Sequence, residues 1–147
     1  MEIRPKLYLS PVIDLFNGEI IAYTFYKNPV YRMVCEMLDK VITHKRSEER
    51  PILHSDQGWH YQMKSYQNKL KKKKIIQSMS RKGNCLDNAV MENFSGILKT
   101  EFFYYKQFSS IEDFTRKIHE YIQWYNHKRI KLKLNGLSPV VNRQQSI

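Results

Sequence analysis

The sequence predicts a mixed α/β fold in which a small sheet is flanked by helices. Two short runs at residues 7–15 and 19–26 are rich in β-branched, aromatic and other apolar residues, and the Asn-Gly pair between them favours a tight turn. Two other segments, 30–43 and 111–129, repeat apolar residues at helical spacing. A chain that carries both patterns in this order is typical of the mixed α/β class.

The first half of the chain contains a hairpin, a helix and a short strand. Pro11 lies within the hairpin predicted for residues 7–26. Because proline has no backbone N–H, we expect it at a sheet edge or a bulge. Residues 30–43 form the first helix, the charged residues 44–50 form a loop, and a short strand follows at 51–55.

The second half continues this alternation. The predicted order is a basic amphipathic helix at 60–71, a strand at 75–77, a polar loop at 78–86, helices at 88–103 and 111–129, and a basic, turn-rich tail. Phe114, Tyr121 and Tyr125 fall on the apolar stripe of the helix at 111–129, so we assign them to the core rather than to a base-stacking surface. The lysines at 71–74 are most simply a solvated helix end.

Basic residues are concentrated in the second part of the chain. Residues 1–60 contain eight basic and eight acidic residues, whereas residues 61–147 contain 17 basic and six acidic residues and carry the whole net charge of +11. Such an asymmetry indicates a polyanionic partner, most often nucleic acid. One alternative is a basic surface without a specific partner. A weaker one is a basic RNA-binding protein, for which the sequence shows no recognisable aromatic motif.

The two cysteines, Cys35 and Cys85, are far apart and do not have the spacing of a metal site. This usage fits a reducing cytoplasm better than a disulfide framework. No apolar run approaches the ~20 residues of a membrane span, and the first residues lack the layout of a signal peptide. At 147 residues, the chain predicts one domain.

Two carboxylates are placed where they can act chemically. Asp56 follows the short strand at 51–55, just before a turn glycine. Glu92 lies near the start of the helix at 88–103, where the helix dipole favours a negative charge. At about 100° per residue, Lys99 falls within about 20° of Glu92, and the apolar residues of this helix fall on the opposite side. The helix can therefore pack on a sheet and still present both charged residues.

Carboxylate oxygens suit hard divalent cations. Magnesium keeps several waters and takes one or two protein carboxylates together with phosphate oxygens. Two such ions about 4 Å apart serve the attacking and leaving oxygens in phosphoryl transfer. Lys99, with Arg81 and Lys82 in the nearby loop, can hold a phosphate backbone. Taken alone, each residue also has an ordinary interpretation: Asp56 as a turn residue, Glu92 as a dipole partner and Lys99 as part of a solvated face.

Several stretches together resemble the catalytic core of bacterial insertion-sequence transposases of the DDE group, which is similar to retroviral integrases. They are HSDQGWHYQ, SMSRKGNCLDNAVMENFSGILKTE and YIQWYNHKRIKLKLNGLSPV, with LYLSPVIDLFNGEIIAY near the start. The resemblance covers nearly the whole chain, in order. It implies a ribonuclease H-like (integrase core) fold whose five-stranded sheet has the order 3-2-1-4-5.

The resemblance also implies roles for individual residues. Asp56 and Glu92 have 35 residues between them, the family's separation. They match the last two members of an Asp-Asp-Glu triad, which would bind two Mg²⁺ or Mn²⁺ ions. Lys99 matches the family's lysine two turns after the Glu. The candidates for DNA contact are Lys99, Arg81, Lys82 and Asn84.

The chain departs from the family at the first Asp of the triad. In the family that Asp lies on a strand before LYLSPVIDLFNG, in a segment resembling T-D-[IV]-T-E-F, whereas this chain starts at MEIRPKLYL. Glu2 is a candidate remnant of that segment, Asp14 belongs to the hairpin and is not a triad member, and Asp87 is a helix cap. We expect the first, central strand to be missing. The hairpin would then either shift against the strand at 51–55 or leave the chain marginally stable.

The expected function is DNA transposition or integration, by metal-dependent cleavage of DNA ends followed by strand transfer. We expect residues 1–147 to form one partial integrase core, truncated or degenerate and inactive or impaired alone, with its metal-site region at 51–103 and its C-terminal helix and basic tail at 110–147. The alternative is a non-catalytic DNA-binding or interfering fragment. The expected partners are DNA (element ends and target) and either further copies of the chain or full-length transposase, with no membrane. The expected location is the bacterial cytoplasm, at the nucleoid.

Overall fold

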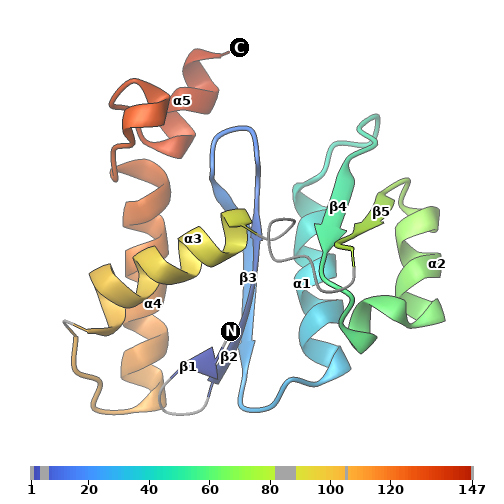
Figure 1. The fold of residues 1–147 in the computed structure, drawn as a ribbon, viewed down its shortest axis with the longest axis horizontal. Helices are drawn as coiled ribbons and strands as arrows, with labels where there is room; N and C mark the ends of the chain where they lie inside the picture. Colours follow the sequence, from blue (N-terminus) through green and yellow to red (C-terminus); the bar gives the residue numbers. More distant parts are fainter. Residues whose placement is uncertain (1, 4–6, 82–88, 105, 147) are drawn as a thin grey trace. The chain divides into compact units, whose positions relative to one another are not determined.

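The structure is a computed structural model that describes residues 2–3, 7–81, 89–104 and 106–146. The described strands are β1 (Glu2–Ile3), β2 (Leu7–Ile13), β3 (Ile20–Tyr26), β4 (Ile52–Ser55) and β5 (Ile76–Met79). The described α-helices are α1 (Tyr31–His44), α2 (Lys64–Lys72), α3 (Ala89–Leu98), α4 (Ile111–His127) and α5 (Pro139–Gln145). Along the described chain, strands and helices alternate from β3 to α3, with two further strands before this part and two further α-helices after it (Figure 1). Single turns of 3₁₀-helix lie at Trp59–Gln62 and Leu132–Leu134, and a π-helical segment, Lys99–Phe103, follows α3.

The strands form two sheets, one with the order β1-β2-β3 and one in which β4 pairs with β5. Strands β1 and β2 are antiparallel, with Glu2 opposite Tyr8 and Ile3 opposite Leu7. Strands β4 and β5 are parallel and in register from Ile52 opposite Ile76 to Ser55 opposite Met79. The expected order 3-2-1-4-5 is thus present in two parts, 3-2-1 and 4-5.

The expectation that the hairpin lacks a neighbouring strand is wrong on the β2 side, because β1 pairs with β2. The two residues of β1 cover the start of β2, and Pro11, further along β2, lies beyond this pairing. The expected shift of the hairpin against the strand at 51–55 is also wrong for the described residues, because β4 pairs with β5 instead. The chain reverses direction between β2 and β3 as predicted, but over a six-residue loop at 14–19 rather than in a tight Asn-Gly turn, with Gly18 at a φ of 80°.

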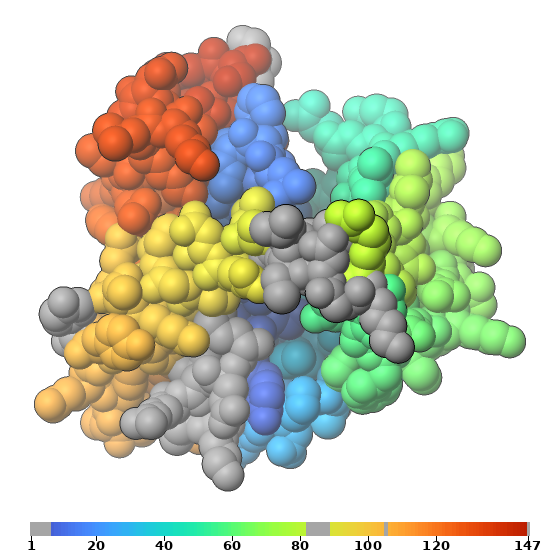
Figure 2. All heavy atoms as spheres, viewed as in Figure 1, coloured from blue at the N-terminus to red at the C-terminus, as the bar shows by residue number. Residues whose placement is uncertain are grey.

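The first compact unit comprises residues 1–11 and 22–92. Helix α1 buries one apolar stripe, as its sequence predicted: Met33, Val34, Met37, Leu38 and Val41. Helix α2 lies beside β5 and buries Tyr66 and Leu70 (Figure 1). Long side chains from the α2 region project from the surface (green in Figure 2).

The second compact unit comprises residues 12–21 and 93–147. Helix α4 is its centre, and the described residues that it buries are Phe114, Ile118, Tyr121, Ile122, Tyr125 and Asn126. The Phe94 ring of α3 meets the Tyr125 ring edge-on at 5.4 Å. Phe114, Tyr121 and Tyr125 are therefore core residues, as expected, whereas Trp124 lies off the stripe and is 43% exposed. The buried amide of Asn126 both donates to and accepts from the backbone of Ile20, which ties α4 to the hairpin.

Three segments differ from the sequence-based expectation. The helix expected at 60–71 is a 3₁₀ turn followed by α2, β5 extends to Met79 into the expected loop, and the tail contains α5. Among the described helices, none is both long and apolar enough to cross a bilayer.

Candidate active site

Asp56 stands directly after β4, and its carboxylate is exposed. Its Oδ1 accepts a hydrogen bond of 2.7 Å from the backbone N–H of Gly58. This is the local turn that an Asp two residues before a glycine favours. The strand end therefore fixes the backbone of Asp56, and the turn fixes one carboxylate oxygen. Asp56 Oδ2 has no hydrogen-bond partner among the residues that the structure describes.

The loop that starts at Asp56 is tied to the end of β5. The Gln57 side chain donates to the Ser80 carbonyl at 3.0 Å, and the Ser80 N–H donates to the Ser55 carbonyl at 2.8 Å. His54 makes ring-nitrogen hydrogen bonds to the hydroxyls of Ser78 (2.9 Å) and Ser80 (3.1 Å). The His54 side chain is thus a hydrogen-bonding residue. Sequence reasoning did not find the roles of Gln57 and Ser80, because their partners are more than 20 positions away in the chain.

Tyr61 is a further neighbour of Asp56 that sequence reasoning missed. Burial raises the pKa of its hydroxyl, the negative charge of Asp56 raises the pKa further, and a hydrogen bond to Ser10 lowers it. The hydroxyl therefore stays protonated at neutral pH and can serve only as a neutral donor or acceptor next to the carboxylate.

Glu92 lies in the first turn of α3 and is exposed, while Phe94 and Leu98 are buried. The helix therefore turns its charged side to solvent, as predicted. Val90 is an exception on the expected apolar side, because 48% of its surface is exposed. Glu92 forms no ion pair with another described residue.

The predicted basic residues occupy two different elements. Lys99 is exposed and begins the π-helical segment after α3, seven residues or about 10 Å along the helix from Glu92. Arg81 is exposed and follows Ser80 at the same end of the β4–β5 sheet as Asp56. Lys82 and Asn84, and Asp87 with them, lie outside the described residues.

Asp56, Glu92 and Arg81 belong to the first compact unit, whereas Lys99 belongs to the second. Within the described ranges, no group of three or more His, Cys, Asp or Glu side chains is arranged to hold a metal ion. The described carboxylates are therefore separate hard oxygen donors and not a ready-made cluster of ligands. Their chemistry fits magnesium, which takes only one or two protein carboxylates.

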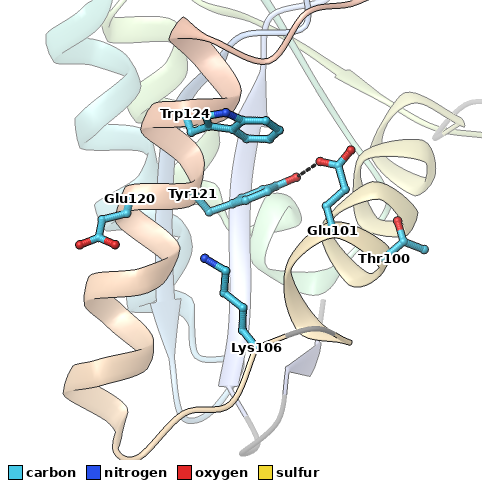
Figure 3. Close-up of a pocket in the computed structure, with 6 residues that line it drawn as sticks. All are labelled: Thr100, Glu101, Lys106, Glu120, Tyr121 and Trp124. Carbon is cyan, nitrogen blue, oxygen red and sulfur yellow. Dashed lines mark hydrogen bonds between the residues drawn. The ribbon is translucent and has the colours of Figure 1, made fainter.

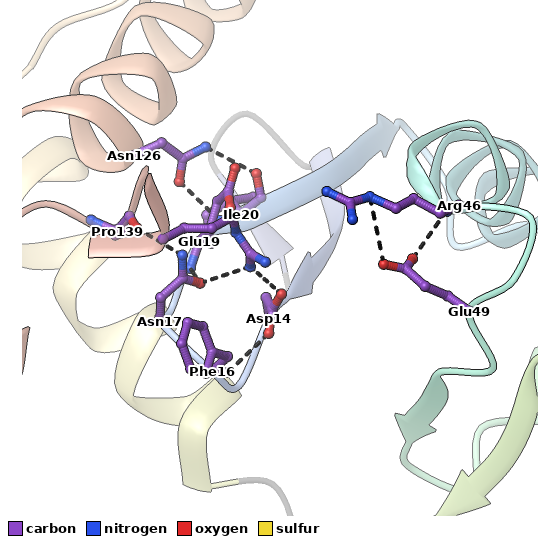
Figure 4. A network of polar contacts seen from close by, with 10 residues as sticks. Asp14, Phe16, Asn17, Glu19, Ile20, Arg46, Glu49, Asn126 and Pro139 are labelled. Carbon is purple, nitrogen blue, oxygen red and sulfur yellow. Dashed lines mark hydrogen bonds and ion pairs between the residues drawn. The ribbon is translucent and has the colours of Figure 1, made fainter. Parts of the chain in front are cut away.

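Asp14 has a structural role in the second unit (Figure 4). Its Oδ1 accepts from the Phe16 N–H at 2.9 Å, and its Oδ2 accepts from the Arg143 guanidinium of α5. Arg143 also contacts Glu19 at 3.0 Å, and the Asn17 amide donates to the Pro139 carbonyl at 2.7 Å. Asp14 thus connects the hairpin turn to α5.

A cavity of about 520 Å³ lies in the second unit beside α4 (Figure 3). Its described lining residues are Thr100, Glu101, Lys106, Glu120, Tyr121 and Trp124. Tyr121 donates to Glu101 at 2.8 Å, and Arg129 holds both oxygens of the same carboxylate. These hydrogen bonds, that of Arg129 first, lower the pKa of Glu101. Of the predicted site residues that the structure describes, none lines this cavity.

Comparison with known proteins decides the family. A family profile described as "Integrase core domain" matches residues 1–85, and a second profile of the same description matches residues 92–147. The chain belongs to the integrase core domain family. It is 56% identical over 141 residues to the putative transposase InsK for insertion sequence element IS150 of Escherichia coli. The alignment covers 96% of this chain and 50% of that protein, so the chain spans half the length of this relative.

Solved integrase structures share the fold of this integrase core chain. The catalytic core domain of BIV integrase superposes with a TM-score of 0.74 at 17% identity, covering 99% of this chain and 90% of the other. The HTLV-2 integrase catalytic core domain in complex with magnesium superposes with a TM-score of 0.67 at 14% identity, covering 98% and 88%. The predicted ribonuclease H-like fold and the resemblance to integrase-like bacterial transposases are confirmed.

Proposed function

We propose that this chain takes part in DNA transposition, by metal-dependent cleavage of the DNA ends of an insertion sequence and transfer of those ends to a target. One observation carries the proposal. In a chain of the integrase core family, two exposed carboxylates, Asp56 at a strand end and Glu92 at a helix start, belong to the same compact unit. The E. coli relative is named as a transposase, and one structural neighbour was solved with magnesium.

Each residue has a defined part in this proposal. Asp56 and Glu92 hold Mg²⁺ or Mn²⁺, two ions in the intact family site, and bound metal would neutralise charge on the phosphate that reacts. Arg81 and Lys99, with Lys82 and Asn84, bind the DNA backbone. In end cleavage, water attacks phosphorus and the element's 3′-oxygen leaves as a hydroxyl. That hydroxyl then attacks a target phosphodiester and displaces the target's 3′-oxygen.

The proposed function also implies binding partners and a cellular location for this chain. The DNA substrates are the element ends and the target, and the protein partners are further copies of the chain or full-length transposase. Because the relative belongs to a bacterium, the site of action is the bacterial nucleoid.

Cation binding by the 147-residue chain tests the two carboxylates. We expect Mn²⁺ affinity, followed by water-proton relaxation, to fall at least about tenfold in Asp56→Asn and in Glu92→Gln. Glu112→Gln is the matched control, because Glu112 is also an exposed carboxylate in the first turn of a helix. Equal Mn²⁺ affinity in the unmutated chain and both site variants would contradict the proposal.

A second candidate function is DNA binding without catalysis, in which the chain competes with full-length transposase for DNA or joins its oligomer. The excess of basic residues, 17 against six acidic residues over positions 61–147, favours it. A cleavage assay with Mn²⁺ separates the two functions. DNA binding that survives Asp56→Ala and Glu92→Ala, without cleavage by the unmutated chain, would assign the second.

A further inference from the structure

Helix α2 ends in four consecutive lysines, Lys71–Lys74, and all four are exposed. From residue 57 to residue 86 the sequence has eight basic residues and no acidic one. Lys69, two residues before the run, pairs with Asp39 of α1. The four lysines of the run form no ion pair with any described residue. Their charges therefore repel one another.

Lys74 occupies a backbone conformation that disfavours lysine. Its φ is 59°, in the left-handed region where glycine is the usual residue. The Lys74 N–H bonds to the Lys71 carbonyl and the Ile75 N–H to the Leu70 carbonyl, which is the hydrogen-bond pattern of a Schellman helix end. A lysine here costs stability relative to glycine. Such strain in an exposed residue indicates a function for its side chain.

The lysine run and Asp56 lie at opposite ends of the β4–β5 sheet. Lys74 precedes β5, whose first residue is opposite Ile52, whereas Asp56 follows Ser55 at the other end of the parallel pair. At about 3.3 Å per residue, the two ends are at least about 10 Å apart along the strands. That distance corresponds to about three base pairs of duplex DNA. The lysines therefore cannot serve the same phosphate as Asp56.

We propose that Lys71–Lys74 bind the phosphate backbone of duplex DNA that flanks the reacting site, without metal. The inference rests on the proposed function for its partner, DNA. The run contains no aromatic residue on which an unpaired base could stack, which favours a duplex over a single strand. Leu70 and Ile75, the apolar residues on either side of the run, are buried, whereas Ile76 and its strand partner Ile52 are exposed. Because exposed apolar side chains near a basic run can also favour a membrane surface, the test below includes anionic vesicles.

Salt-dependent binding tests this surface. Affinity of the 147-residue chain for a 30-base-pair duplex of arbitrary sequence is measured by fluorescence anisotropy in EDTA at several NaCl concentrations. Each phosphate contact contributes about 0.9 to the slope of log affinity against log salt. We expect a combined K71Q/K72Q/K73Q/K74Q variant to lower this slope by about 3.6, with binding at least about tenfold weaker at 100 mM NaCl. Lys27→Gln removes an exposed lysine from the same unit and leaves the slope unchanged.

Lys74 allows a sharper comparison. Lys74→Gln and Lys74→Gly each remove one charge, so both lower the slope by about 1. Only Lys74→Gly also relieves the left-handed strain, and we expect it to raise Tm by about 2–4 °C. A stabilised variant that binds DNA less well cannot be explained by misfolding.

Three outcomes would overturn the inference. The first is an unchanged slope in the combined variant. The second and third are metal-free binding that is tighter than to the duplex, either to a single-stranded RNA of equal length or to vesicles with 30% anionic lipid. If the unmutated chain binds no DNA, with or without Mn²⁺, the proposed function fails as well. If DNA binding persists with an unchanged slope in the combined variant, only the role of the lysine run is lost.

Discussion

Gly58 decides whether the Asp56 carboxylate can keep its position. A Cβ atom at Gly58 would lie 2.9 Å from Asp56 Oδ1 and 3.4 Å from two atoms of the Tyr61 ring. The first distance is too short for carbon and oxygen, so the carboxylate would have to turn away and lose its bond to the Gly58 N–H. The backbone angles of Gly58 do not themselves require glycine, because its φ is −53°. The space for the carboxylate is what requires it.

We therefore expect Gly58→Ala to weaken Mn²⁺ binding several-fold, because one oxygen donor is displaced. Gly96→Ala is the matched control. Gly96 lies in α3 with nothing within 4 Å of the added methyl group, so this change raises the free energy of unfolding by about 0.5–1 kcal/mol and leaves Mn²⁺ affinity alone. Water-proton relaxation and urea unfolding measure both effects. Undiminished Mn²⁺ affinity in Gly58→Ala would mean that Asp56 does not need this turn.

Asp14 and Asp56 are both aspartates at a strand end, yet they should respond differently to substitution. Asp14→Asn removes the charge that pairs with Arg143, so we expect it to lower the free energy of unfolding by about 1 kcal/mol without changing Mn²⁺ affinity. Asp56→Asn should instead lower Mn²⁺ affinity and leave the free energy of unfolding unchanged. A loss of Mn²⁺ affinity in Asp14→Asn would contradict the conclusion that Asp14 is not a member of the catalytic triad.

The candidate site was predictable as far as local patterns determine it. The run of Asp56, Gln57 and Gly58 after a short strand predicts a turn carboxylate, and helical spacing placed Glu92 on the exposed side of its helix. The support around Asp56 was not predictable. Gln57 reaches Ser80, and Tyr61 approaches Ser10, through contacts between distant parts of the chain that depend on how the elements pack.

At the scale of elements, the long periodic helices and the short strand at 51–55 were predicted well, whereas the 3₁₀ turn before α2 and helix α5 were not. Helices α1 and α4 carry enough repeats for one apolar stripe to define them. Helix α5 has seven residues, and its signal was Ser138 followed by Pro139, the cap and first-turn residues that favour a helix start. No side-chain cap marks the start of α2, so the 3₁₀ turn before it could not be separated from the helix by pattern alone.

The ion pair between Glu101 and Arg129 connects the π-helical segment to the residues that directly follow α4. Arg129 donates to both carboxylate oxygens at 2.6–3.0 Å, and Tyr121 adds a third donor. We expect Glu101→Gln to lower the free energy of unfolding by about 1–2 kcal/mol at pH 7. Glu120→Gln is the control: the Glu120 and Arg116 side chains are both about 60% exposed, and their pair contributes less than about 0.5 kcal/mol.

The same pair predicts a pH dependence. The folded chain lowers the pKa of Glu101, so the stabilisation is complete above the unfolded value of about 4.3 and is lost as the pH falls through the folded pKa. Thermal unfolding between pH 3 and 7 should therefore show a smaller acid-induced loss of stability in Glu101→Gln than in the unmutated chain. Parallel curves for the two proteins would show that the pair contributes nothing to acid sensitivity.

At the scale of the whole molecule, the chain runs repeatedly between two compact units. Strands β2 and β3 and helix α3 each have residues in both, since the units divide at Pro11, Ile21 and Glu92. Unfolding one unit alone would break hydrogen bonds within these three elements. Continuous secondary structure that crosses a unit boundary favours cooperative unfolding. We therefore expect the two units to unfold together, although each has its own core.

The chain's two tryptophans provide the test, because Trp59 lies in the first unit and Trp124 in the second. Trp124→Phe leaves fluorescence that reports on the first unit, and Trp59→Phe leaves fluorescence that reports on the second. Since the three shared elements couple the units, both variants should show urea transitions with the same midpoint, which coincides with the loss of helical circular dichroism. The circular dichroism transition of each variant controls for a shift caused by the substitution itself. Fluorescence midpoints that differ between the variants, while their circular dichroism shows two steps, would mean that the units fold independently.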